Sequence, residues 1–374
     1  MIRVGIIGIG ISRLESDSPL SEVDLAKEAV VKALEYAQID SSDIDYFVEC
    51  AYSSYNDISE LSRKLDLKGP RRHTFLRNID GAFGAVYAVS SLMSGESKIA
   101  LVVGYGKSSE SDLKYLSSLY AQAGFLKGSG LDFISFSALQ AKVFMDRLGI
   151  GEEELGMIVI KNRRNGFSNE DAHIREKIIL EDILSSPYVA EPIRKLMIAP
   201  KTDGAAAMIF ARGDIVKTKQ RRAWVDGFGV NIGPYYPGYE DLAHLNSLRY
   251  AARRAYKLSG IRNPKREVDF AEIMDVFPHI ELMSIEALEL VAEKRLVKPI
   301  HDGSFFKEGK LPINPSGGAL CTNPPGAVGL LRMIEVTKRL VGDVMDIRKP
   351  LRRGVADCWT FFNQYNVVWV IAGE

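Results

Sequence analysis

The sequence predicts an α/β protein in which one chain topology occurs twice. Short apolar runs typical of buried strands alternate with longer amphipathic runs typical of helices, and their order in the first half returns in the second. Of the 374 residues, 46% are hydrophobic and 26% are charged, which is globular composition with enough length for a sizeable core. We therefore expect a large fold built from two related halves.

The first half is expected to alternate between strands and helices. Helical spacing of apolar residues predicts a helix over 21–39, and a second helix over 81–93 consists of small residues and ends at Ser94-Gly95. Because small side chains allow close packing, the second helix should be central. Strands are expected at residues 3–11, 44–50, 73–79, 99–104 and 205–211.

Between the last two strands of this half the pattern loosens. Residues 107–195 are interpreted as an insertion that covers the sheet, with amphipathic helices at 137–148 and 174–184 and charged connections such as 161–165.

The second half repeats the early order, and no low-complexity linker precedes it. We place the boundary between the halves at 218, giving units of 1–218 and 219–374 that should pack intimately. Strands are expected at residues 223–230, 270–276 and 367–372, helices at 247–258, 281–291 and 326–340, and a Gly-rich turn at 314–318.

Charge and cysteine content exclude several classes of protein. Lys+Arg 48 and Asp+Glu 48 balance, so nothing steers the chain toward nucleic acid or an anionic membrane. Three widely separated cysteines fit neither a disulfide framework nor a zinc site, and we expect no metal. No run of roughly 18 apolar residues occurs. The chain is expected to be cytoplasmic, in a reducing compartment.

Four segments, in order along nearly the whole chain, resemble the thiolase superfamily, and most closely its sterol-carrier-type and archaeal members. They are the helix ending Ser94-Gly95 with the strand KIALVVGYGK after it, TDGAAAMIF (202–210), EIMDVFPHIELMSIEALEL (272–290) and NPSGGALCTNPPGAVG (314–329). The resemblance implies a duplicated thiolase fold, with two βαβαβαββ-like halves in five layers, α-β-α-β-α. It also implies an acyl-CoA ligand, no covalently bound cofactor, and a homodimer or tetramer with 73–93 at the two-fold axis.

The same resemblance assigns catalytic positions to residues of the wrong type. Thiolases form an acyl-enzyme on a cysteine at a helix N-terminus, and the family spacing places Asn78 there. Met274 stands in the place of the first catalytic histidine, and Asn323 in the place of the second. Asp275 corresponds to the aspartate beside the pocket.

The C-terminal catalytic loop of the family corresponds to 354–361. It aligns Cys358 with the family's acid/base, although a small buried hydrophobe is the more common role of such a cysteine. The glycine that completes an oxyanion hole is absent, since Thr360 or Phe361 takes its place.

Other candidates concern substrate binding. Asn314, Ser316, Gly317 and Gly318 are expected to hold a turn beside the pocket, where a Gly pair allows close approach of a ligand or simply makes a tight turn. Aromatic residues that could wall an acyl tunnel are Trp359, Phe361, Phe362 and Tyr365.

The remaining cysteines and His279 are expected to be structural. Cys50 ends a strand in the core. Cys321 lies near a helix start, which could lower its pKa, but packing is the favoured role. His279 falls on a helix, and we expect a surface or capping residue.

Two function hypotheses follow. In the first, the chain is a divergent thiolase-like protein that binds a CoA thioester without a Cys acyl-enzyme. It would be a non-catalytic subunit, or a retro-aldol C–C lyase working with a small OB-fold, zinc-ribbon partner, as in relatives that use tyrosines; Tyr365 is then the candidate. In the second, it is an acetyl-CoA C-acetyltransferase whose nucleophile is Cys321 or Cys358. A pure scaffold is not separable from the first hypothesis by sequence.

Overall fold

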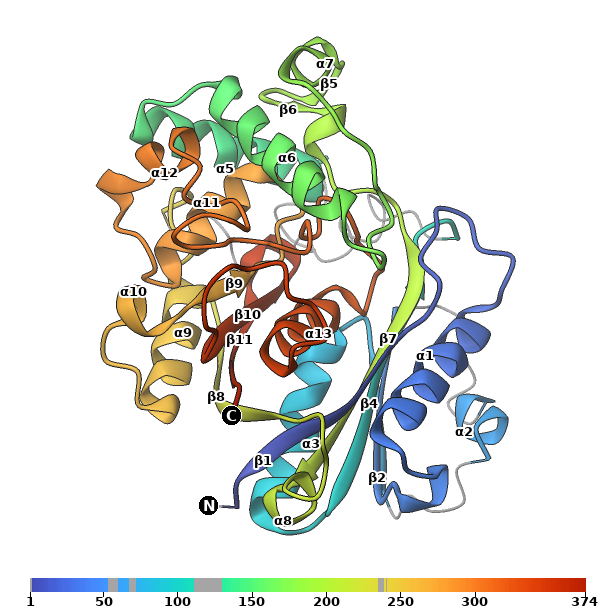
Figure 1. Cartoon of the computed structure of the whole chain (residues 1–374). Coiled ribbons are helices and arrows are strands. Elements are labelled where there is room, and N and C mark those ends of the chain that lie inside the picture. The colour runs from blue at the N-terminus through green and yellow to red at the C-terminus, as the bar shows by residue number, and fades with distance from the viewer. Residues whose placement is uncertain (1, 53–59, 67–71, 111–129, 235–238, 240) are drawn as a thin grey trace.

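The computed structural model describes residues 2–52, 60–66, 72–110, 130–234, 239 and 241–374 (Figure 1). The side chain of Phe361 and residues 111–129 of the expected insertion lie outside this part. Within the described residues, no helix combines the length and the apolar character needed to cross a bilayer.

Nine strands form one sheet in the order β3-β2-β4-β7-β1-β8-β11-β10-β9, and β5 and β6 form a separate pair. The strands are β1 (Val4–Ile11), β2 (Tyr46–Tyr52), β3 (Arg72–Arg77), β4 (Ile99–Lys107), β5 (Tyr188–Ala190), β6 (Ile193–Arg194), β7 (Asp203–Arg212), β8 (Ala223–Ile232), β9 (Phe270–Glu272), β10 (Arg353–Thr360) and β11 (Tyr365–Ala372). The helices are α1 (Glu22–Ala37), α2 (Glu60–Lys64), α3 (Gly81–Ser94), α5 (Phe133–Leu148), α6 (Glu152–Phe167), α7 (Leu180–Ser185), α8 (Gly213–Val216), α9 (Asn246–Ser259), α10 (Pro264–Glu267), α11 (Pro278–Ala287), α12 (Val297–His301) and α13 (Val328–Val341).

The strand order repeats in the two halves. From its outer edge the first half runs β3-β2-β4-β7-β1, and the second runs β9-β10-β11-β8, which is the same order without an equivalent of β3. A single parallel bridge between Ala271 and Ile313 occupies the place where that strand would pair. The halves join where β1 pairs with β8. The boundary expected at 218 lies between α8 and β8 and stays a prediction.

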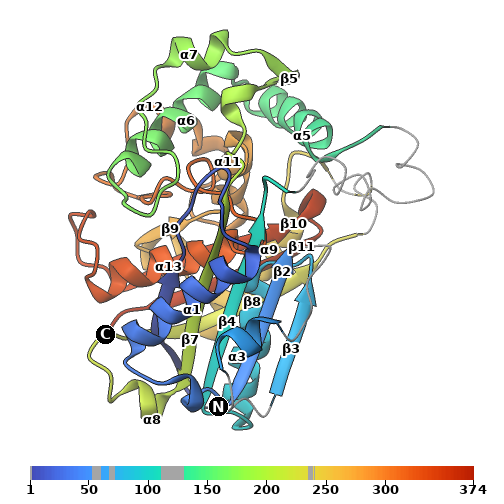
Figure 2. The same ribbon diagram turned by 90° about the vertical axis from the view of Figure 1, so that its right-hand side faces the viewer.

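Helices form the layers on both sides of each half of the sheet. Helix α1 packs on β1, β4 and β7, whereas α9 packs on β8 and β11 at the opposite side (Figures 1 and 2). Helices α3 and α13 lie between the halves and contact each other. The duplicated, layered α/β fold expected from the sequence is therefore confirmed.

Close backbone contact brings the two central helices together. A Cβ atom at Gly104 of β4 would lie 2.1 Å from the carbonyl oxygen of Gly326, so no side chain fits there. The N–H of Gly81, the first residue of α3, donates to that same oxygen at 2.8 Å. Glycines thus allow the start of α3 to meet the loop that leads into α13.

The segment between β4 and β7 differs from the prediction in two places. Residues 161–165, expected as a charged connection, belong to α6, whose polar side chains Lys161 and Asn162 are buried. Residues 174–179 are not helical, because the backbone there is tied to another loop, Ile174 N–H donating to the Cys321 oxygen at 2.9 Å. Helices α5 and α6 pack against α11.

Two expectations for the second half were also wrong. The strand expected over 270–276 ends at Glu272, because the next two N–H groups bind side chains: Ile273 donates to Asn314 and Met274 to Asp357. The segment 354–361, expected as a loop, is mostly strand β10.

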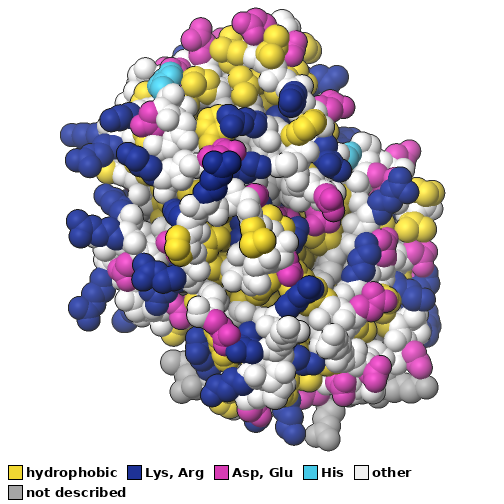
Figure 3. Space-filling model, viewed as in Figure 1, with side chains coloured by type: hydrophobic (Ala, Val, Ile, Leu, Met, Phe, Trp, Pro, Cys, Tyr) yellow, Lys and Arg dark blue, Asp and Glu magenta, His cyan; other side chains and the backbone are white. Residues whose placement is uncertain are grey.

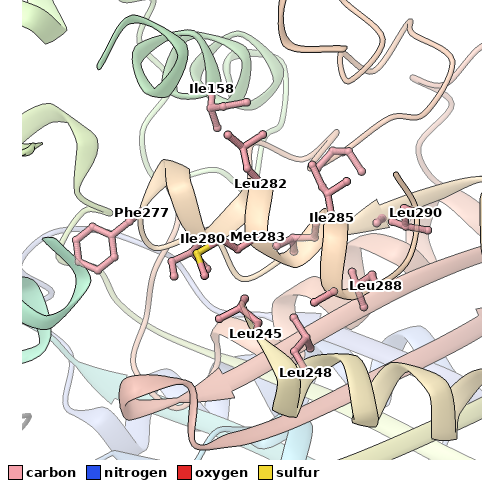
Figure 4. Close-up of a cluster of buried hydrophobic side chains, with 14 of the residues drawn as sticks. Ile158, Leu245, Leu248, Phe277, Ile280, Leu282, Met283, Ile285, Leu288 and Leu290 are labelled. Atoms are coloured by element: carbon pink, nitrogen blue, oxygen red, sulfur yellow. The ribbon is translucent and has the colours of Figure 1, made fainter. Parts of the chain in front are cut away.

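A large apolar cluster holds α11 in place. Its side chains include Leu248 of α9 and Leu245 just before it, Ile158 of α6, and Leu282 and Ile285 of α11 itself (Figure 4). On the surface, Lys and Arg gather along the edge formed by α9, α10 and α12, while acidic side chains are scattered over the visible face (Figure 3).

Candidate functional site

A cavity of about 110 Å³ lies where α3 and α13 begin. It is lined by Tyr52, Asp80, Phe133, Met274, Val276, Asn323, Pro325, Gly326, Val328, Trp359 and Thr360. These residues come from both halves of the chain and from the segment between β4 and β7. Most of the lining is apolar, with a few polar groups, which is the usual make-up of a small-molecule site. A space of this size takes a short acyl group, since a cavity of about 150 Å³ holds benzene.

Among the described residues that line the cavity, Asp80 is the one that carries a carboxylate. It is the N-cap of α3 and accepts a hydrogen bond from Ala82 N–H at 2.8 Å. It also accepts from Gly329 N–H at 3.0 Å and Leu330 N–H at 3.2 Å, which belong to the first turn of α13. Burial raises the pKa of the Asp80 carboxyl, while these three N–H groups favour its anion. One carboxylate therefore occupies the positive ends of two helices.

Cys358 lies beside Asp80, inside strand β10. Its sulfur is 3.7 Å from the Met274 sulfur, and a Cβ atom at Gly329 would lie 2.5 Å from it. Burial, and then the charge of Asp80, raise the pKa of the Cys358 thiol well above its usual value. The residue is fully buried. At neutral pH it is a thiol packed behind the cavity, not a thiolate.

Asn323 lines the cavity, and hydrogen bonds hold both its backbone and its side chain. The N–H of Asn323 donates to the Thr202 hydroxyl at 3.2 Å, and that hydroxyl is 2.8 Å from Nδ1 of His173. The Asn323 side-chain amide donates to the Pro200 oxygen at 3.4 Å. This geometry leaves the amide within reach of the cavity that it lines.

Aromatic rings form another wall. The indole N–H of Trp359 donates to the Met274 oxygen at 2.8 Å, and the Phe133 ring packs on Trp359 with centroids 5.7 Å apart. Thr360 also lines the cavity, and its buried hydroxyl has no hydrogen-bond partner among the described residues. Because a buried hydroxyl is normally paired, Thr360 is a candidate ligand contact.

Two residues predicted for the site lie away from it. Asn78 sits two positions before Asp80 with φ 53°, and its N–H donates to the Ala51 oxygen at 2.9 Å. Tyr365 begins β11 and is 43% exposed. Within the described part of the chain, neither lines the cavity.

The predicted turn at 314–318 is buried in a network of charges. Asn314 donates to Glu281 at 2.9 Å, and Ser316 donates to Glu272 at 2.6 Å. Gly317 and Gly318 have φ of 102° and 68°, so the turn needs glycine. These four residues belong to the support behind the cavity, and the described lining does not include them.

Asp275 is part of the same network. It accepts from Asn162 at 2.6 Å and from Ala319 N–H at 2.6 Å. Burial, and then the nearby Glu281, raise the pKa of Asp275 well above its usual value, and the positive charge of Lys161 opposes this. Lys161 pairs with Glu281 at 2.9 Å. This arrangement fixes the backbone that carries Met274.

His279 is fully buried, so the expectation of a surface or capping role was wrong. It lies in the first turn of α11, its ring stacks on Phe277 at 5.8 Å, and neither ring nitrogen has a partner among the described residues. Burial lowers the pKa of His279 to about 3. The ring is therefore neutral at physiological pH.

The other two cysteines are buried as expected. Burial raises the pKa of Cys321 to about 12, and its thiol donates to the Asn162 oxygen at 3.3 Å. Cys50 is buried in the core and burial raises its pKa as well.

One group within the described residues has donors that could hold a metal. It comprises His244, Glu286 and Glu293, whose ligand atoms lie within 4.8 Å of one another. Both carboxylates already bind arginine, Glu286 with Arg249 at 2.6 Å and Glu293 with Arg147 at 2.8 Å. With these arginines, the three residues form a charge cluster that links α5, α9 and α11.

Comparison with known proteins extends this picture. A family model described as thiolase C-terminal domain-like matches residues 236–370. The chain is 29% identical to the acetyl-CoA acetyltransferase of Methanocaldococcus jannaschii, over 95% of this chain and 94% of that protein. It is 27% identical to sterol carrier protein 2 of Oryctolagus cuniculus, over 91% of this chain and 66% of that protein. This chain is a relative of the thiolases. The resemblance seen in the sequence is thus confirmed.

Solved structures show that the fold is the same. The thiolase relative superposes on an Ltp2-ChsH2(DUF35) aldolase with a TM-score of 0.88 and 20% identity, covering 99% of this chain and 98% of that one. It superposes on human mitochondrial 3-ketoacyl-CoA thiolase in complex with CoA with a TM-score of 0.76 and 16% identity, covering 100% and 98%.

Sequence reasoning did not single out several cavity residues, among them Asp80, Tyr52 and Phe133. An aspartate directly before a predicted helix is an N-cap signal, so Asp80 could have been found. Tyr52 and Phe133 come from a strand end and from the region expected as an insertion, and neither carries a local signal for a cavity.

Proposed function

We propose that this chain binds a CoA thioester in the cavity at the start of α3 and α13, does not form a cysteine acyl-enzyme, and cleaves a C–C bond by a retro-aldol reaction. The observation that carries the proposal is the carboxylate of Asp80. It occupies the N–H groups of both central helices, where an acyl-enzyme mechanism would need a thiolate or an oxyanion.

The state of the cysteines supports this reading over the acetyltransferase alternative. A nucleophilic cysteine must reach substrate and ionise near neutral pH. Cys50, Cys321 and Cys358 are all buried, with pKa values raised by burial. Names such as acetyl-CoA acetyltransferase among the relatives, at 25% to 29% identity, therefore do not outweigh the chemistry of this cavity.

Three features favour a lyase over a non-catalytic subunit. The cavity accommodates a short acyl group and carries the polar side chains of Asp80, Asn323 and Thr360, and a thiolase of this fold binds CoA. The chain superposes on the DUF35-partnered aldolase with a TM-score of 0.88 and on the thiolase–CoA complex with a TM-score of 0.76, so the aldolase is the more similar of these two structures. By the same analogy we propose a small OB-fold, zinc-ribbon partner. A homodimer or tetramer and a cytoplasmic location stay predictions.

The direct test supplies 3-hydroxybutyryl-CoA to the protein purified from its native source, with any bound partner chain retained, and measures acetyl-CoA and acetaldehyde. We expect both products in equal amounts. Val276→Phe, which fills the cavity, should abolish thioester binding and product formation. The matched surface variant Val189→Phe should leave both unchanged. Thermal unfolding of both variants checks that they fold. Thioester binding without products from the native protein would reduce the proposal to a non-catalytic subunit.

A further inference from the structure

Asp80 combines two properties in one helix cap. Its carboxylate is buried and held by three backbone N–H groups, at 2.8, 3.0 and 3.2 Å. The same residue lines the cavity, where no other carboxylate occurs among the described lining residues. A purely structural cap would not need to reach the cavity.

We propose that Asp80 is the general base that removes the proton from the 3-hydroxyl group of a 3-hydroxyacyl-CoA, with the Thr360 hydroxyl donating to the thioester oxygen. This inference rests on the proposed function and names the acid/base residue of that reaction.

The reaction balances without any further reagent. The hydroxyl proton passes to the Asp80 carboxylate, and the O–H electron pair forms the carbonyl of the released aldehyde or ketone. The bond between C2 and C3 breaks, and its electrons form the enolate of the thioester. C2 then takes the proton back from Asp80, giving the shortened acyl-CoA. Asp80 ends the cycle as a carboxylate.

The surroundings of Asp80 suit this role. Burial raises the pKa of its carboxyl above the usual range, which makes the anion a stronger base. The three N–H groups and the two helix ends hold the carboxylate in one position without consuming the proton that it takes up. The Cys358 thiol also contacts this carboxylate, and substrate would approach it from the cavity that Asp80 lines.

Thr360 supplies the complementary donor. Its hydroxyl is buried and has no partner among the described residues, although such groups are normally paired. An enolate oxygen gains most from a donor that is already oriented in a dry site. A thioester bound with its carbonyl toward Thr360 would give that hydroxyl its missing acceptor.

The test compares Asp80→Asn with the native protein in the cleavage of 3-hydroxybutyryl-CoA. An amide is close in size but cannot take the proton, so kcat should fall by about 100-fold or more. Thr360→Val should lower kcat by about 10-fold or more with little change in KM. The control Thr337→Val removes another buried hydroxyl, which donates inside α13 to the Met333 oxygen, and should keep full activity.

The pH profile of the native protein keeps the inference testable if Asp80→Asn does not fold. Activity should rise with pH through one ionisation whose pKa is above that of an ordinary aspartate. Native-like activity of a folded Asp80→Asn protein, or an acid limb at the ordinary aspartate value, would overturn the role of Asp80 and leave the proposed function standing. Absence of cleavage by the native protein purified together with its partner chain would overturn both.

Discussion

The carboxylate of Asp80 accepts a hydrogen bond from the N–H of Gly329 at 3.0 Å, so one side chain joins the starts of α3 and α13. These helices belong to the two halves of the duplicated fold. Gly329 must be glycine here, because a Cβ atom would lie 2.4 Å from Cys358 Cβ and 2.8 Å from Asp80 Oδ1. The contact therefore unites the halves and shapes the cavity at the same point.

Replacing this carboxylate should destabilise the whole fold. In Asp80→Ala, three buried N–H groups lose their acceptor, and we expect a loss of about 3 kcal/mol in the free energy of unfolding. The matched control is Ser21→Ala, which removes the exposed N-cap of α1 and should cost about 1 kcal/mol. Urea unfolding measures both. Equal losses would show that Asp80 is an ordinary cap.

A second prediction concerns the buried pair of Arg332 and Glu272, which are 2.9 Å apart with side chains 2% and 0% exposed. Arg332→Met leaves the carboxylate of Glu272 with less compensation and should cost about 3 kcal/mol. Lys142→Met breaks an exposed pair with Asp146 and should change stability by less than about 1 kcal/mol. A neutral Arg332→Met protein in chemical denaturation would contradict the view that this network supports the turn at 314–318.

Much of the fold could be predicted because its signals are local. The small-residue helix 81–93 and the strands and helices of the first half up to β4 lie close to their expected places. The polar face of α6 could not be predicted in this way. Lys161 and Asn162 look like solvated residues in sequence, and only the fold shows that they are buried against Glu281 and Asp275.

The candidate site was harder to predict because the cavity combines distant segments. Family spacing pointed to Asn78, whereas the cavity contains Asp80, the N-cap of the helix. Cys358 was aligned with a catalytic loop, yet pairing of β10 with β11 and β9 places it within a central strand of that half. Such pairings depend on contacts that no single segment encodes.

His279 should make stability depend on pH. Its folded pKa of about 3 lies below the unfolded value of about 6.5, so the unfolded chain binds the additional proton between these values. This contribution to stability is present above about pH 6.5 and is lost as pH falls toward 3, by roughly 1.4 kcal/mol per pH unit.

Replacement of the ring isolates that effect. His279→Leu should lose less stability than the native protein between pH 6.5 and 4, as measured by urea unfolding at each pH. His301→Leu, at a side chain that is 50% exposed, should follow the native curve. Parallel curves for His279→Leu and the native protein would mean that the buried ring does not control acid stability.

The most direct test of the central claim is mass spectrometry of the chain with acetyl-CoA and acetoacetyl-CoA. Under native conditions we predict one CoA thioester bound per chain, and under denaturing conditions we predict the unmodified mass, because none of the three buried thiols can attack the thioester. A gain of one acetyl group in the denatured protein, mapped to Cys321 or Cys358, would contradict the account and establish an acyl-enzyme.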